Sequence, residues 1–240
     1  MKAEKVQAVI LAGGLGTRMR PWTETVPKPL LAVGEKPFLQ HQIELLVRHG
    51  ITDVVLLVAY LGEQIEEYFG DGKAFGCRIS YSYEASPMGT GGALKNAEKL
   101  LGREFLVVNG DTYLDIPYRE FAQEFATGDA TAVIAAYKPD AVNGTLPADK
   151  VPCNLAVGVD RKVMLYRKKQ PGGLNYVDAG VLGLRKAVLE KMRAGETFSL
   201  EENIFPRLIA EGQMRAWVTQ EPFYDMGSPE GLKALVEKLS

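Results

Sequence analysis

The feature that most constrains the fold of this chain is the alternation, over its first half, of short apolar runs with stretches of helical periodicity. Most runs are as continuously apolar as strands buried on both faces, and each helical stretch ends at a glycine. We expect strands over Val6–Ala12, Asp53–Ala59, Cys77–Tyr83 and Glu104–Val108, and helices from Pro37 to Gly50, over Gly62–Phe69 and over Thr90–Leu101. This β-α-β-α-β-α-β order predicts an α/β fold with a parallel sheet and right-handed crossovers.

The second half is less regular and predicts strands that extend the sheet. Ser199 and Glu202 form a capping box for a helix through Glu211, which Pro206 should kink or interrupt. The other expected elements are helices over Tyr118–Thr127 and from Ser228 to Leu239, a loop over Lys138–Val151, and strands over Ala130–Tyr137, Leu155–Val159, Val163–Tyr166, Tyr176–Leu184 and Met214–Thr219. No linker divides the sequence, so we expect one domain over residues 1–240.

The length and charge of the chain narrow the classes of function. Its 240 residues, 46% of them hydrophobic, suffice for one large α/β domain. The net charge of −2, from 28 basic and 30 acidic residues, offers no basic field for nucleic acid and no polybasic face for a membrane. The two cysteines match neither a disulfide framework nor a metal motif and suit a reducing cytoplasm. The N-terminal apolar run is too short for a signal peptide or a membrane span.

The first apolar run ends in a loop suited to phosphate. Gly13, Gly14 and Gly16 lack the Cβ atoms that would keep a ligand from the backbone, whose N–H groups can then point at phosphate oxygens. Thr17 adds a hydroxyl, and Arg18 adds a guanidinium suited to bidentate phosphate contact. A plain α/β turn without a nucleotide is the competing interpretation. The loop lacks the third glycine of the dinucleotide fingerprint, and the chain contains no P-loop string.

A second cation follows the glycine loop, because Lys28 lies between Pro27 and Pro29. Prolines disfavour helical backbone at the residues before them, so we expect a stiff extended arm that returns one ammonium group to the loop. A solvated loop lysine is the alternative. A glycine cradle with two cations predicts a site for a polyphosphate.

Three features fall at the expected carboxyl ends of strands, which is where sheets of this kind bind ligands. They are the glycine loop, the loop Glu84–Gly92 and Asp111. Mg²⁺ takes one or two carboxylates together with phosphate oxygens and waters, and Asp111 and Asp225 are the candidates at strand ends. A structural turn role is the competing interpretation for each aspartate.

The string Gly-Gly-Leu-Gly-Thr-Arg-Met-Arg-Pro-Trp-Thr from Gly13, with Pro-Lys-Pro-Leu-Leu from Pro27, resembles the signature of the sugar-1-phosphate nucleotidyltransferases. These enzymes join a nucleoside triphosphate to a sugar 1-phosphate and release pyrophosphate. The resemblance extends over essentially the whole chain. It implies a three-layer α/β/α sandwich around a mostly parallel, Rossmann-like mixed sheet (a GT-A-like nucleotidyltransferase fold). It also implies a nucleotide-binding half over residues 1–112 and a sugar-phosphate-binding half over residues 113–240.

The resemblance assigns catalytic roles to Arg18, Lys28 and Asp111. Asp111 and Asp225 match the metal pair of the family and would hold Mg²⁺. Arg18 would hold the triphosphate and stabilise the departing pyrophosphate, with a surface salt bridge as the alternative. Lys28 would bridge the α-phosphate and the incoming sugar phosphate.

The string Glu84-Ala-Ser-Pro-Met-Gly-Thr-Gly-Gly resembles the second nucleotide loop of the family. Gly89 would let the base lie against the backbone, and Glu84 would read the base edge, unless it is a solvated turn carboxylate. A carboxylate accepts from N1–H and the amino group of guanine, or from N3–H of uracil or thymine, which favours GTP. The expected nucleotide-binding residues are Leu11, Ala12, Gly13, Gly14, Gly16, Thr17, Arg18, Glu84 and Gly89.

The sugar side departs from the best-known members of the family. Their Gly-Val pair and Glu-Glu-Lys-Pro string are replaced here by Asn154-Leu and by Tyr-Arg-Lys-Lys from Tyr166, so the expected sugar-reading glutamate is missing. Lys168 would contact the sugar phosphate, and Asn154 and Asp178 would bind sugar hydroxyls. An equal alternative is that the three basic residues of the Tyr-Arg-Lys-Lys string only form a solvated turn. The remaining motifs resemble most closely the D-glycero-D-manno-heptose-1-phosphate guanylyltransferase branch.

These patterns together predict a cytoplasmic, Mg²⁺-dependent nucleotidyltransferase whose partners are a nucleoside triphosphate and a sugar 1-phosphate, first of all GTP with a heptose or mannose 1-phosphate. The sequence leaves homo-oligomerisation open. One alternative keeps the chemistry but uses UTP, dTTP or CTP with glucose, N-acetylmuramate or a polyol phosphate. The other is a non-catalytic regulatory subunit that binds nucleotide sugars. Retention of both cations and both aspartates argues against it, because pure binding needs no metal pair.

Overall fold

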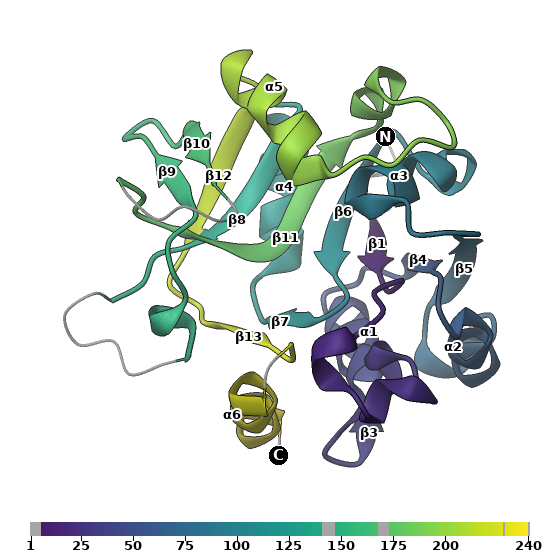
Figure 1. Ribbon diagram of the computed structural model, residues 1–240. Helices are drawn as coiled ribbons and strands as arrows, with labels where there is room; N and C mark the ends of the chain where they lie inside the picture. Colours follow the sequence, from purple (N-terminus) through teal and green to yellow (C-terminus); the bar gives the residue numbers. More distant parts are fainter. Residues whose placement is uncertain (1–5, 141–146, 168–172, 228, 240) are drawn as a thin grey trace.

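A computed structural model describes residues 6–140, 147–167, 173–227 and 229–239, and a seven-stranded mixed sheet runs through it (Figure 1). The strands of the first half are parallel neighbours, as the alternation of the sequence predicts. In the second half, β11 is antiparallel to both of its neighbours, β6 and β8, whereas β12 is parallel to β8. The order across the sheet is β12 (Met214–Thr219), β8 (Ala132–Tyr137), β11 (Val177–Arg185), β6 (Glu104–Asn109), β1 (Gln7–Leu11), β4 (Asp53–Val58) and β5 (Arg78–Tyr83).

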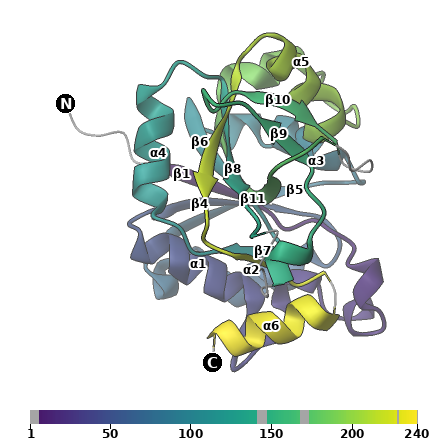
Figure 2. The ribbon, with the colours of Figure 1, turned by 90° about the vertical axis from the view of Figure 1, so that its left-hand side faces the viewer.

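Helices cover both faces of this sheet and make a three-layer molecule (Figure 2). One face carries α1 (Phe38–Arg48), α2 (Gly62–Phe69) and α4 (Tyr118–Thr127). The other carries α3 (Gly89–Asn96) and α5 (Phe205–Ala210). The expected α/β sandwich is confirmed.

Strand β1 shows why the sequence requires two covering layers. Ala8 and Ile10 belong to the core on the α1 side, whereas Val9 belongs to the core on the α3 side, and all three are 0% exposed. Successive strand residues point to opposite faces, so a continuous apolar run is stable only when both faces are buried. Two apolar layers therefore fix the strand that leads into the glycine loop.

The helix expected from Ser199 to Glu211 is interrupted where the proline predicts. Residues Leu200–Ile204 form one wide π-helical turn, and α5 follows with Pro206 in its first turn, where the missing N–H costs no helical bond. Ser199 Oγ accepts from Glu202 N at 3.2 Å, as a capping box requires. The return bond comes instead from Asn203, whose Oδ1 accepts from Ser199 N at 2.8 Å.

Three short antiparallel pairs complete the described fold, and two of them were not expected from the sequence. In one pair, strands that were expected to extend the main sheet form a two-stranded sheet of their own instead: β9 (Leu155–Val157) with β10 (Val163–Tyr166). The others join β2 (Ala32–Val33) to β3 (Lys36–Pro37) and β7 (Thr112–Leu114) to β13 (Phe223–Asp225), and α6 (Pro229–Leu239) packs against β13. The β7–β13 pair ties the end of the chain to the centre of the sheet (Figure 1).

Other local expectations need correction. The helix expected to reach Leu101 ends at Asn96 and is followed by a 3-10 turn over Glu98–Leu100. The loop expected over Lys138–Val151 contains a 3-10 turn at Pro147–Lys150, and residues 141–146 lie outside the described structure. Trp22, in the signature loop, is 59% exposed and so does not pack into the core.

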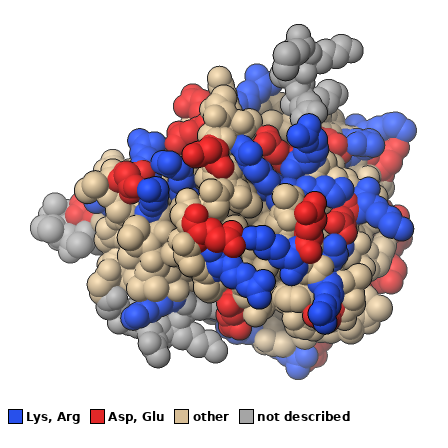
Figure 3. Space-filling model, turned by 90° about the horizontal axis from the view of Figure 1, so that it is seen from above, with Lys and Arg blue, Asp and Glu red and all other residues tan. Residues whose placement is uncertain are grey.

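The described surface fits the bulk composition. On the face shown in Figure 3, acidic and basic side chains are interspersed rather than gathered into one field. Within the described ranges, none of the helices combines the length and apolarity that crossing a bilayer requires.

Candidate active site

The glycine loop follows β1, the neighbour of the central strand β6, and folds back on itself. Gly16 has left-handed backbone with φ of 60°, and its carbonyl accepts from Thr23 Oγ1 at 2.9 Å. Thr17 and Arg18 then form an exposed 3-10 turn. Apart from Gly14 and its two chain neighbours, no described residue has an atom within 4 Å of a Cβ built on Gly14, so its backbone is open to a ligand.

The loop meets Glu84 on its other side. A Cβ on Gly13 would lie 2.8 Å from Glu84 Oε1, so glycine is what lets the carboxylate approach the loop. Glu84 Oε2 accepts from Met88 N at 3.0 Å. Burial raises the pKa of Glu84, and the Met88 N–H opposes that shift. The expected base reader therefore lies beside the expected phosphate loop.

Leu11 and Ala12, the residues before the glycines, make backbone hydrogen bonds to neighbouring segments. Ala12 is 2% exposed, and its N–H is already donated to Leu57 O at 2.8 Å. The Leu11 carbonyl accepts from Gly110 N at 3.2 Å, and a Cβ on Gly110 would collide with that carbonyl. The ends of β1 and β6 thus approach closely, which brings the residue after Gly110 to the loop.

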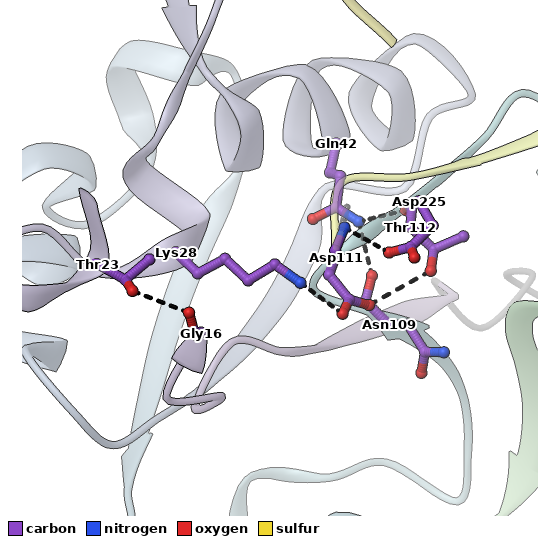
Figure 4. Close-up of polar contacts among 9 residues, drawn as sticks. Gly16, Thr23, Lys28, Gln42, Asn109, Asp111, Thr112 and Asp225 are labelled. Atoms are coloured by element: carbon purple, nitrogen blue, oxygen red, sulfur yellow. Dashed lines mark hydrogen bonds and ion pairs between the residues drawn. The ribbon is translucent and has the colours of Figure 1, made fainter. Parts of the chain in front are cut away.

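That residue, Asp111, is paired with Lys28. Lys28 Nζ lies 2.7 Å from Asp111 Oδ2, and the lysine is 8% exposed (Figure 4). The Pro-Lys-Pro arm is not extended, which corrects the sequence expectation: Lys28–Leu30 form a 3-10 turn, closed by Leu30 N bonding to Pro27 O at 2.8 Å. The tight turn directs the ammonium group inward.

The β7–β13 pair brings Asp225 to the same place. Asp225 lies opposite Thr112, the residue after Asp111, and Met226 N donates to Asp111 O at 3.0 Å. The pKa of Asp225 is raised, first by burial and then by the charge of Asp111; the Gly227 N–H, Lys28 and Arg18 oppose the shift. Two carboxylates therefore share one partly buried, anionic position.

Arg18 reaches this position from the glycine loop. A Cβ on Gly227 would lie 2.8 Å from Arg18 Nη2 and 2.9 Å from Asp225 Oδ1, so both charged groups border the same glycine. The structure thus brings together Arg18, Lys28, Asp111 and Asp225. Separation of these residues would have ruled out the shared phosphate site that the sequence suggests.

The second nucleotide loop has a structural explanation for its glycines. Gly89 has φ of 71°, and a Cβ there would collide with Phe198 O. Gly91 N and Gly92 N donate to that same carbonyl at 2.9 and 3.2 Å. These contacts dock the loop onto the segment before α5, and a base contact at Gly89 stays a prediction.

On the face of the sheet that carries α5, a small cavity is lined by Asp178, one of the expected sugar residues. Asn154 Oδ1 accepts from Asp178 N at 2.7 Å, and Asp178 lines the cavity with Leu11 and Asn109. Lys168 lies outside the described residues. The structure adds two polar neighbours that no sequence pattern indicates: Tyr166 OH donates to Asp178 Oδ2 at 3.3 Å, and Glu201 lines the cavity from the π-helical turn.

A family model for nucleotidyl transferases matches residues 7–151, which include the glycine loop, Lys28, Glu84 and Asp111. The chain belongs to the nucleotidyl transferase family. Asp225 lies outside the matched range, but the fold places it opposite Thr112, which lies within that range next to Asp111.

Curated relatives extend the similarity along the chain. Mannose-1-phosphate guanyltransferases of Saccharomyces cerevisiae and Neurospora crassa are 36% and 33% identical to it, over 94% of this chain. The chain spans 62% of the length of these relatives.

Solved structures with the same fold include two further proteins. HddC from Yersinia pseudotuberculosis, also solved complexed with GMP-PN, matches with a TM-score of 0.82 and 30% identity over 98% of this chain and 100% of its own. A putative glucose-1-phosphate thymidylyltransferase from Bacillus anthracis matches with a TM-score of 0.81 over 97% of this chain and 94% of its own; at 22% identity it shares the fold alone.

Two aspartates suit a divalent cation that takes its remaining ligands from the phosphates of a nucleotide. Among the described residues, no group of three or more His, Cys, Asp or Glu side chains is placed to hold a metal ion. Mg²⁺ commonly uses one or two carboxylates and takes its other ligands from substrate phosphates and water. The raised pKa of Asp225 beside Asp111 marks a position where an added cation would relieve repulsion.

Proposed function

We propose that this chain transfers GMP from GTP to a sugar 1-phosphate, giving a GDP-sugar and pyrophosphate, with a heptose or mannose 1-phosphate as the acceptor. The observation that carries the proposal is the meeting of Lys28, Asp111 and Asp225 with Arg18, which the glycine loop supplies. The names of the guanyltransferase relatives support the choice of base and of mannose.

The chemistry requires two anions to be brought together rather than a new nucleophile to be made, because a sugar 1-phosphate is already ionised. In the proposed mechanism Arg18 binds the triphosphate and stabilises the leaving pyrophosphate. Lys28 places its ammonium between the α-phosphate and the sugar phosphate. Asp111 and Asp225 would hold Mg²⁺, which supplies positive charge to the reacting phosphates when bound.

Base selection is assigned to Glu84. Its carboxylate is held beside Gly13 by the Met88 N–H, so its direction is fixed before a nucleotide arrives. Two acceptor oxygens suit the N1–H and amino group of guanine, whereas uracil and thymine offer one N–H on that edge. This difference supports GTP over UTP and dTTP.

Sugar hydroxyls are assigned to Asn154 and Asp178, with Tyr166 and Glu201 as further polar neighbours of the cavity. Lys168 is proposed for the sugar phosphate. We also propose residues 1–112 and 113–240 as nucleotide and sugar-phosphate halves of one domain. A cytoplasmic location suits the substrates and the free thiols of Cys77 and Cys153.

The test is a pyrophosphate-release screen of GTP, UTP, dTTP and CTP against mannose, heptose, glucose and N-acetylmuramate 1-phosphates. The proposal expects GTP with mannose or heptose 1-phosphate to exceed every other pair at least tenfold. A preference for another pair would contradict the substrate assignment. Absence of release with all pairs, with retained binding of nucleotide sugars, would favour the regulatory subunit.

A further inference from the structure

The turn that carries Asp111 is held by an amide from another element. Gln42, on α1, is 3% exposed, and its Nε2 donates to Asn109 O at 2.8 Å and to Thr112 O at 2.7 Å (Figure 4). These carbonyls stand on either side of the Gly110–Asp111 pair. One side chain therefore closes the turn from both ends.

The chemistry of the partners fixes how this amide is oriented. Both partners are carbonyl oxygens, which only accept hydrogen bonds, so the NH₂ group and not the oxygen must face the turn. Gln42 Oε1 is left buried, with no hydrogen-bond partner among the described residues. A buried polar atom without a partner destabilises a protein. The two hydrogen bonds from Gln42 Nε2 are therefore present although they leave Gln42 Oε1 buried and unpaired.

Backbone contacts hold the positions between the two clamped carbonyls. Gly110 N bonds to Leu11 O of β1, and Asp111 O accepts from Met226 N beyond β13. Each of the four residues 109–112 is therefore fixed by α1, β1 or the β13 segment. Of these anchors, only the one from α1 depends on the identity of a side chain.

We propose that Gln42 is the positioning residue for the metal-binding carboxylate of Asp111. Gln42 is buried and acts through the backbone of the turn, from which Asp111 points at Lys28 and lies beside Asp225. The proposal rests on the proposed function, since it assumes that Asp111 binds a divalent cation with the nucleotide. Outer partners that orient metal ligands commonly contribute 10–100-fold to metal affinity.

The test replaces the amide with an apolar group of similar length, Gln42→Met, in the full chain. Mn²⁺ binding is measured by electron paramagnetic resonance, with a non-hydrolysable GTP analogue present. Hydrogen–deuterium exchange of the segment 105–114 is measured without metal. We expect at least tenfold weaker Mn²⁺ binding and faster exchange, with analogue binding in EDTA within twofold of wild type.

Two variants of α1 serve as controls. Gln40→Met makes the same change on the same helix, where Gln40 bonds to Glu44 and Tyr68 away from the turn. Leu46→Ala lowers stability from a side chain that is 1% exposed. Both should keep wild-type Mn²⁺ affinity. If Gln42→Met does not fold, Gln42→Asn, which retains the amide but shortens its reach, takes its place with the same expectation.

The outcomes separate this inference from the proposed function. Mn²⁺ affinity within twofold of wild type in a folded Gln42 variant would overturn the positioning role and leave the proposed function standing. An equal loss of affinity in Leu46→Ala would also overturn it, because general destabilisation would then account for the effect. A wild-type chain that binds no Mn²⁺ with the analogue would contradict the proposed function, and this inference with it.

Discussion

Lys28 Nζ lies 2.7 Å from Asp111 Oδ2 across 83 positions of sequence. The pair joins the arm after the glycine loop to the turn after β6. Each charge compensates the other in the site proposed for phosphates and a cation. A bound phosphate would offer Lys28 a new anionic partner, and a divalent cation held by Asp111 would supply the positive charge there, so the charges of the site would stay matched.

Lys28→Met should remove the bridge between the two phosphates. We expect kcat/KM to fall at least 100-fold, about 2.7 kcal/mol of transition-state stabilisation. Pyrophosphate release at varied sugar 1-phosphate measures it. Lys36→Met is the matched control, because Lys36 is an exposed lysine that pairs with Glu44 on α1. A Lys28→Met enzyme within fivefold of wild type would exclude the bridging role.

Arg18→Ala should act on the leaving pyrophosphate. Loss of a preorganised donor to developing charge typically lowers kcat about 10²–10³-fold, and we expect a loss of this size. Arg20→Ala, at an exposed arginine two residues along the same loop, should change kcat less than threefold. Comparable losses in both variants would indicate a general electrostatic effect of the loop instead.

Glu84→Gln should weaken the choice of base and change its pH dependence. Reading guanine needs the ionised carboxylate, and burial raises the pKa of Glu84 above its usual 4.5. The KM for GTP should therefore rise as pH falls through that raised pKa. The amide does not titrate, so the variant should lose this dependence and discriminate GTP from UTP at least tenfold less. Glu63→Gln, on the exposed side of α2, is the control; unchanged preference in Glu84→Gln would refute base reading.

Asp225→Asn should stabilise the protein while inactivating it. Burial and Asp111 raise the pKa of Asp225, so the folded state binds this proton more tightly than the unfolded state. The free energy of unfolding then falls as pH rises above the usual 3.8, and the ionised group destabilises the metal-free protein at pH 7. Without metal at pH 7, we expect the Tm of Asp225→Asn to be higher than that of wild type. The difference between the two Tm values should be smaller near pH 3. A lower Tm at pH 7 would contradict this electrostatic account.

The part of the fold that follows local patterns could be predicted from the sequence. Val9 between Ala8 and Ile10 needs two covering layers, and that requirement alone implies helices on both faces. Arg18 and Lys28 stand out because cations beside glycines and prolines have few structural uses.

The parts of the site that depend on distant contacts could not be predicted in this way. The β7–β13 pair has only three residues in each strand and joins segments about 110 residues apart, so neither strand has a period to detect. The 3-10 turn at Lys28 overrides the preference of residues before proline. One weak sequence feature indicates that Gln42 is buried: it is a polar residue on the apolar face of α1, four residues after Phe38 and four before Leu46.

The most direct test of the central claim compares Asp111→Ala with Asp115→Ala. Both remove an aspartate from the same segment, but Asp115 pairs with Arg48 outside the site. Pyrophosphate release is measured with GTP, Mg²⁺ and the preferred sugar 1-phosphate. The account predicts at least a thousandfold loss for Asp111→Ala and less than a threefold change for Asp115→Ala. Near-normal turnover by Asp111→Ala would contradict it.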